Sequence, residues 1–152
     1  MIRPGLVVLG SLLLALSATA AEPGIKIQFV GGTLPDLAKA GASLDLTSTE
    51  KLSIHINHRP PIQIFYPKVN TLEYGQNVNR RYAEAILLSP VFLLSKSRKH
   101  FVTVGYQDAD GKQQALVFRV QKGDIRSLLA SLEARTGRRV EFTDQEARKT
   151  GK

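Results

Sequence analysis

The stretch from Val117 to Gly137 constrains the fold of this chain most tightly. Residues 117–120 alternate between apolar and polar side chains, which is the period of a half-buried strand. Residues 125–136 carry apolar side chains at helical spacing, and Gly137 can adopt the left-handed conformation that ends a helix. We expect the Asp124 carboxylate to cap this helix by accepting from an amide of its first turn. The apolar stripe consists of Ile125, Leu128, Leu129 and Leu132.

Short apolar segments separated by turn residues fill the chain before this helix. Prolines at 60, 61 and 67 end two of the segments, and Asp110-Gly111 is a strong hairpin signal. Hairpins imply antiparallel pairing. We therefore predict an α+β fold, mainly β, in which an antiparallel meander forms a curled sheet or partly open barrel and one C-terminal amphipathic helix covers an open end. The expected strands are 25–30, 43–47, 52–56, 62–66, 69–75, 101–106 and 114–120, with a short addition at 140–142.

The N-terminus has the features of a secretion signal. Arg3 precedes an apolar run from Leu6 to Leu16, and small residues follow at 18–20. The run is too short to span a bilayer comfortably, and no cysteine follows it that could carry a lipid anchor. An uncleaved membrane anchor is the alternative. We predict a signal at 1–20, an N-terminal strand and linker at 21–40, the main domain at 41–142 and a polar tail at 143–152.

The charge of the chain favours anionic partners. The sequence has 21 Lys and Arg residues against 13 Asp and Glu residues, and the predicted signal removes one cation, Arg3. Such an excess suits lipid headgroups or acidic proteins. Nucleic acid is not an expected partner, because a periplasmic or secreted protein rarely meets it. The chain has no cysteine, which excludes disulfides and thiolate metal sites.

The order of the segments resembles a known superfold. The pattern consists of an opening hairpin at 43–52 that reads x-L-x-L-T-x-x-x-x-L, the strands 62–66, 69–75 and 99–104, the Asp110-Gly111 hairpin and the closing helix. From about Gly41 to Gly137 it is similar to the pleckstrin-homology-like fold, in the compact bacterial form related to PH and GRAM domains. The resemblance implies a binding module for lipids or proteins and no enzyme. It does not imply a phosphoinositide pocket, because the basic residues of such a pocket have no one-to-one match here.

The most unusual segment runs from Arg80 to His100. An apolar stretch at 83–95 is bracketed by cations, is too short as a helix (about 20 Å) for a bilayer core of about 30 Å, and contains Pro90. We expect it to insert at a membrane interface while its basic flanks meet anionic headgroups. The apolar contacts would be Leu87, Leu88, Val91, Phe92 and Leu93, and the basic contacts would be Arg80, Arg81, Lys96, Arg98 and Lys99.

Two other interpretations of this segment stay open. Buried apolar runs are commoner than exposed ones, so residues 83–95 also fit a core strand or helix pair with basic ends. The same apolar surface would also suit an acidic partner protein or an oligomer interface. The cationic run at 96–100 alone is compatible with a solvated turn before a strand.

Catalytic and metal-binding patterns are absent from the sequence. It contains no Gly-x-Ser-x-Gly, no His-Glu-x-x-His and no phosphate-binding glycine loop. His55 and His58 would lie on opposite faces if the strand continued, and His100 sits among cations. We predict an exported, non-catalytic binding module without cofactor or metal. The alternatives are a structural or oligomerising envelope protein with segment 80–100 buried, and an enzyme of unrecognised type.

Overall fold

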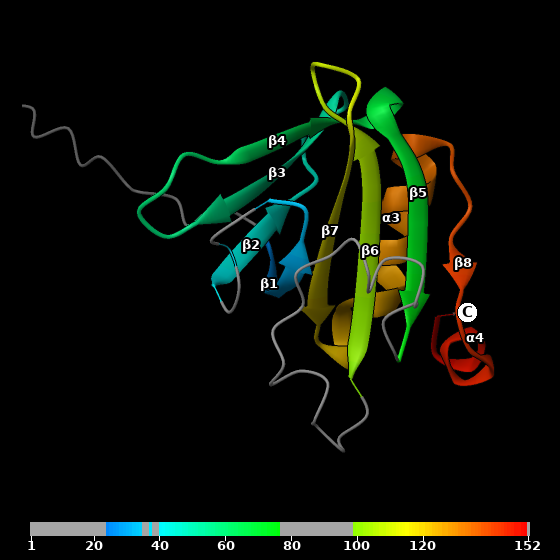
Figure 1. Ribbon diagram of the computed structural model, residues 1–152. Helices are drawn as coiled ribbons and strands as arrows, with labels where there is room; N and C mark the ends of the chain where they lie inside the picture. Colours follow the sequence, from blue (N-terminus) through cyan, green and yellow to red (C-terminus); the bar gives the residue numbers. More distant parts are fainter. Residues whose placement is uncertain (1–23, 35–36, 38–39, 77–98, 152) are drawn as a thin grey trace, which may run out of the picture.

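A computed structural model describes residues 24–34, 37, 40–76 and 99–151, which form one curved sheet with two helices (Figure 1). The strands lie in the order β4-β3-β2-β1-β7-β6-β5-β8. The first four are β1 (Ile25–Gly32), β2 (Gly41–Asp45), β3 (Lys51–Ile56) and β4 (Ile62–Phe65). The other four are β5 (Val69–Gly75), β6 (His100–Gln107), β7 (Gln113–Val120) and β8 (Glu141–Phe142). The helices are α3 (Ile125–Thr136) and α4 (Gln145–Gly151), and two short 3-10 turns are η1 (Tyr66–Lys68) and η2 (Lys122–Asp124).

Two antiparallel meanders make up the sheet. Strands β1 to β4 form one, β5 to β7 form the other, and β1 pairs with β7 to join them. The predicted mainly β fold with one main helix near the C-terminus is confirmed. The expectation of purely antiparallel pairing is wrong at β8, which runs parallel to β5. After β7 the chain continues as α3, which packs on one face of the sheet. It then reaches the edge of the sheet at β5, where β8 runs in the same direction as β5.

The β6–β7 hairpin forms where Asp110-Gly111 predicts it. Gly111 has a φ of 77°, in the left-handed region that glycine adopts easily. The Asp108 carboxylate accepts from the backbone N–H groups of Asp110, at 3.0 Å, and Lys112, at 2.9 Å. A hydrogen bond from the Gln114 side chain and these backbone bonds hold the pKa of Asp108 below its ordinary value. The Asp108 side chain therefore has a structural role in this turn.

Helix α3 has the predicted bounds and the predicted buried stripe. Gly137 ends it with a φ of 67°, and its N–H donates to the Glu133 carbonyl at 2.9 Å. The expected Asp124 cap is wrong, because the Asp124 side chain makes no capping hydrogen bond. The turn η2 precedes the helix and gives Asp124 a helical backbone (φ −95°, ψ −10°), whereas a capping residue normally has an extended one.

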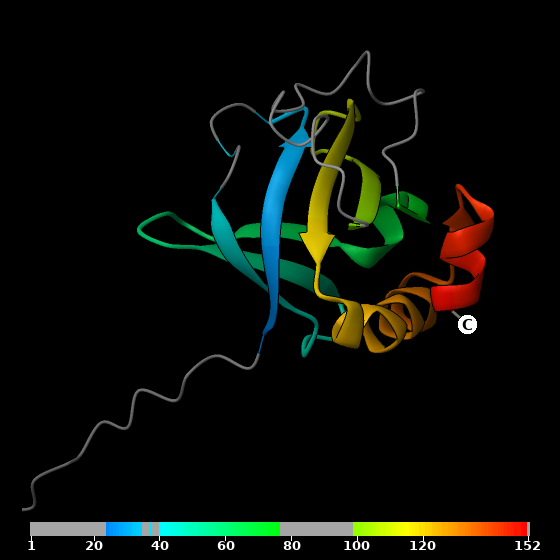
Figure 2. The same ribbon diagram turned by 90° about the horizontal axis from the view of Figure 1, so that it is seen from below.

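The core lies between the sheet and α3, and α4 packs next to α3 (Figure 2). Phe29, Leu44, Tyr74 and Phe118 are fully buried there from both meanders, and Leu128 faces them from α3. Burial of such side chains is the main force that holds the two meanders together. No helix among the described residues has the length and apolar character needed to cross a bilayer.

Candidate functional site

Most of the contact residues predicted from the sequence lie outside the described residues. Lys99 is described, is half-buried and comes directly before β6. The others fall in the range 77–98, outside the described residues: Arg80, Arg81, Leu87, Leu88, Val91, Phe92, Leu93, Lys96 and Arg98.

The two ends of that range meet the sheet at one place, which we call the basic end. Gly75 closes β5 and pairs with Phe101 near the start of β6, while His100 pairs with Val120 at the end of β7. Strand β7 leads at once into η2 and α3, so both helical elements start at this same end (Figure 1). Gln76 and Lys99, the described residues on either side of the range 77–98, therefore lie at the same end of the sheet as the N-terminus of α3.

Three cations surround a hollow at the basic end. The hollow has a volume of about 500 Å³, and we call it the basic notch. Its cations come from three elements, because Lys122 belongs to η2, Arg126 to the first turn of α3 and Lys149 to α4. Arg126 donates through Nε to the Thr150 carbonyl at 3.3 Å, 24 positions later in the chain. The complete lining is Lys122, Gly123, Arg126, Lys149 and Thr150.

Acidic side chains at this end have structural roles of their own. The Asp144 carboxylate accepts from the backbone N–H of Gln76, at 2.8 Å, and from that of Ala147, at 2.6 Å. These bonds fix the start of α4 against the end of β5. Asp124 lies between the basic-notch residues Gly123 and Arg126 in sequence but is not part of the lining. The charge that faces the basic notch is therefore positive.

A tyrosine–histidine pair lies beside the basic notch. The Tyr74 hydroxyl is 2.6 Å from His100 Nδ1, and the two rings stack with centroids 6.0 Å apart. Burial lowers the pKa of His100 below its ordinary value, and the nearby Lys122 charge lowers it further. Burial raises the pKa of Tyr74. Both groups are therefore neutral at pH 7, and the positive charge of this end comes from its lysines and arginines.

The shifted histidine gives a testable pH dependence. Because the pKa of His100 is lower in the folded state than its ordinary 6.5, the unfolded chain takes up this proton first. The free energy of unfolding should therefore be level above pH 6.5 and should fall as the pH drops through the folded-state pKa. Urea denaturation at a series of pH values should show this slope in the natural chain and a weaker slope in His100→Gln. Equal slopes in the two proteins would contradict the assignment to His100.

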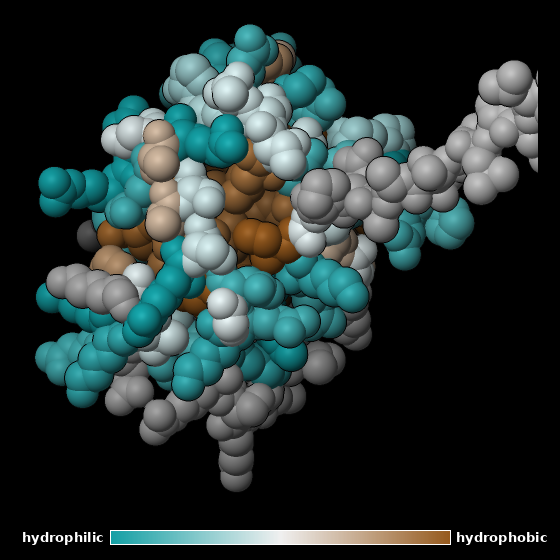
Figure 3. Space-filling model, turned by 180° about the vertical axis from the view of Figure 1, so that it is seen from behind, coloured by the Kyte–Doolittle hydropathy of each residue, from teal (hydrophilic) through white to brown (hydrophobic). Residues whose placement is uncertain are grey.

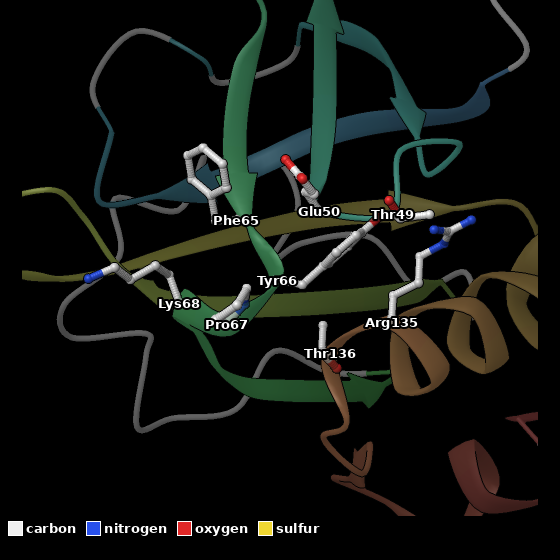
Figure 4. A pocket seen from close by; sticks show the side chains of 8 residues that line it. All are labelled: Thr49, Glu50, Phe65, Tyr66, Pro67, Lys68, Arg135 and Thr136. Atoms are coloured by element: carbon white, nitrogen blue, oxygen red, sulfur yellow. The ribbon is translucent and has the colours of Figure 1, made fainter.

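A second and larger hollow lies at the opposite end of α3. We call it the aromatic groove, and its volume is about 720 Å³ (Figure 4). Phe65 is 52% exposed and is the one large apolar side chain among the described residues that lies open to solvent. The Lys51 ammonium is 6.0 Å from the centre of the Phe65 ring. The lining consists of Thr49, Glu50, Phe65, Tyr66, Pro67, Lys68, Arg135 and Thr136.

Arg135 is held firmly at the edge of this groove. Its Nη1 donates to the Ser48 carbonyl at 2.6 Å, and its guanidinium carbon is 5.8 Å from the centre of the Tyr66 ring. The Tyr66 hydroxyl donates to the same carbonyl at 3.2 Å. Burial raises the pKa of Tyr66, and the charge of Arg135 opposes that rise. These contacts join α3 to the β2–β3 turn and to η1.

Arg135 also borders a third hollow on its other side. This apolar hollow has a volume of about 450 Å³ and lies between α3 and the strands β1 and β2. Figure 3 looks at this side of the molecule and shows hydrophobic side chains at the bottom of a hollow with hydrophilic ones around it. The lining is Gly24, Ile25, Leu44, Leu46, Thr47, Ser131 and Arg135.

The residues weighed for metal binding do not come together. Across the described ranges, no group of three His, Asp or Glu side chains is placed to hold a metal ion. His55 lies on β3, whereas His58 follows the end of that strand in a turn with a φ of 61°. The three hollows offer cations, aromatic rings and apolar walls, which are the means of binding an anionic or amphipathic molecule.

The comparisons with known proteins add no identification. No family model matches the chain, and no curated protein matches it.

Proposed function

We propose that this chain is an exported, non-catalytic binding module of the pleckstrin-homology-like type that contacts an anionic membrane surface. The basic notch supports this proposal most strongly. It adds Lys122, Arg126 and Lys149 to the end of the sheet where Gln76 and Lys99, the described residues that flank the range 77–98, are located. Cations near an anionic bilayer contribute roughly 1 kcal/mol each. A surface that combines these residues with the basic flanks of the segment would bind anionic lipid and lose affinity in salt.

The topology supports the pleckstrin-homology-like part of the proposal. Two joined meanders are followed directly by one helix that covers the core, which is the element order that the resemblance implies. Segment 80–100 then corresponds to the connection between β5 and β6. In the proposed mode, its apolar centre enters the acyl boundary while the basic end rests on the headgroups.

Co-sedimentation with vesicles tests the proposal. We expect the natural chain, purified after export, to sediment with anionic vesicles at low salt, to bind less at high salt and to ignore neutral vesicles. Leu88→Asp with Phe92→Asp should abolish binding without unfolding the protein. Ala109→Asp with Ala134→Asp is the matched control, because it adds the same charge at two exposed positions away from the basic end.

Three outcomes would count against membrane contact. Absence of vesicle binding under all conditions would contradict it and would favour an acidic partner protein. Loss of the fold in the Leu88/Phe92 variant would place the segment in the core. Equal loss of binding in the control variant would show a general charge effect with no role for the apolar centre.

One observation favours the second candidate, an oligomerising envelope protein. Strand β4 stands at an edge of the described sheet and carries the exposed Phe65. Open edges with apolar side chains can pair with another chain. Light scattering after size exclusion would then show an oligomer that Phe65→Asp converts to a monomer.

A further inference from the structure

The apolar hollow and the aromatic groove share one residue, Arg135, and are otherwise lined by different residues. We propose that together they bind a single-chain amphiphile with a monoanionic head, such as a fatty-acid carboxylate. The chain of the ligand lies in the apolar hollow, and its head meets Arg135. This inference goes beyond the proposed function, because it concerns the other end of α3 and requires no contact with a bilayer.

The walls of the apolar hollow suit a hydrocarbon chain. Ile25 of β1 and Leu46, the residue after β2, supply apolar surface because both are only partly buried. Leu44 also lines the hollow but is 1% exposed. Ser131 is the small side chain that α3 contributes opposite them. Ligand sites usually have volumes of about 300–1,000 Å³ with mostly apolar walls, and the two hollows of about 450 and 720 Å³ fall in this range. Covering this open apolar surface with a hydrocarbon chain removes it from water, which contributes favourable binding free energy.

The head of the ligand follows from the charges beside the hollow. Arg135 has five N–H donors, and its hydrogen bond to the Ser48 carbonyl uses Nη1. Lys68 is a second cation in the aromatic groove, and Glu50 is the one acid in its lining. The Asp45 carboxylate, between the apolar-hollow residues Leu44 and Leu46, also acts on Arg135, so two cations are balanced by two acids. A site without excess positive charge disfavours a dianionic head more strongly than a monoanionic one. A guanidinium beside apolar walls is stabilised when a carboxylate completes its hydrogen bonds.

Figure 4 shows how Arg135 lies among the residues of the aromatic groove. The Arg135 side chain extends from α3 past Tyr66, with its guanidinium near Thr49. The Ser48 carbonyl and the Tyr66 ring fix the guanidinium before any ligand arrives. Binding therefore requires little ordering of this group, which favours affinity.

Calorimetric titration with laurate, below its micellar concentration, tests the chain-binding half of the inference. We expect one laurate to bind per protein, with affinity reduced by about tenfold or more in Ser131→Phe, whose ring fills the hollow. Ser127→Phe is the matched control, since it lies one turn earlier on α3, is exposed and lines none of the three hollows. Its affinity should stay within about twofold of the natural chain. No laurate binding by the natural chain, or equal effects of the two variants, would overturn the inference.

Comparison of laurate with 1-dodecanol tests the role of Arg135. Arg135→Gln keeps an amide donor for the Ser48 carbonyl but removes the charge. The affinity for laurate should therefore fall by roughly tenfold, while the affinity for dodecanol should not change. Arg138→Gln changes an exposed arginine just beyond α3 and should affect neither ligand. An equal loss of both ligands in Arg135→Gln would contradict recognition of an anionic head. If that variant fails to fold, the Ser131 and Ser127 pair still decides whether the hollow holds the chain.

Discussion

Replacing Phe118 by alanine is expected to lower the free energy of unfolding by about 3–5 kcal/mol. Phe118 is 0% exposed on β7 and pairs with Phe29 on β1 and with Val102 on β6. It therefore lies where the two meanders join, and its removal leaves a cavity that neighbours in both meanders cannot fill without moving apart. Urea denaturation followed by circular dichroism would measure the loss.

Arg119→Ala is the control for this substitution. Arg119 is the next residue of the same strand and is exposed. Its removal should change the free energy of unfolding by no more than about 0.5 kcal/mol. A loss below about 1 kcal/mol for Phe118→Ala would contradict the position of Phe118 in the core.

Gly32→Ala is expected to cost about 1–3 kcal/mol, although it adds a single methyl group. A Cβ atom at position 32 would lie 2.6 Å from the Ala115 carbonyl oxygen. The Ala115 carbonyl belongs to the backbone of β7, which pairs with β1. The steric clash can therefore be removed only if the two strands separate near the bulge in their register. Thermal and urea unfolding would both detect the cost.

Gly41→Ala is the matched control in another strand. A Cβ atom at position 41 would meet nothing within 4 Å. The substitution should be neutral or stabilising by about 0.4–1 kcal/mol, because alanine lowers the entropy of the unfolded chain. Equal effects at 32 and 41 would contradict the close approach of β1 to β7.

The sequence predicts the fold well where local patterns and burial agree. Helix α3 has its predicted bounds because its apolar stripe, Arg135 and Gly137 all indicate the same element. The β6–β7 hairpin follows from the turn preferences of Asp110 and Gly111. Local patterns could not show that Asp124 fails to cap α3, because the η2 turn gives Asp124 a helical backbone before the helix begins. Strand β8 has only two residues, and its parallel direction depends on a crossing that no local pattern reveals.

The site depends still more on contacts between distant residues. The sequence identifies Lys99 and the basic segment as candidates, but Lys122, Arg126 and Lys149 become one cluster only when α4 folds back beside α3. A cation in the last turn of a helix suits the helix dipole, but the Arg135 guanidinium also reaches Ser48, 87 positions earlier. Neither grouping follows from spacing along the chain. Cations that recur on the helical segments of the C-terminal third are the sequence signal that could have indicated the cluster.

Vesicle binding by two charge-reversal variants is the most direct test of whether the basic end contacts an anionic membrane. Arg126→Glu with Lys149→Glu reverses two charges of the basic notch, and Arg138→Glu with Arg139→Glu reverses two exposed charges just beyond the far end of α3. Both variants change the net charge equally. We predict that the first variant binds anionic vesicles about tenfold or more weakly, while the second retains most of the binding. Equal weakening in both would mean that net charge alone drives association, and full binding by the first would show that the basic end does not face the membrane.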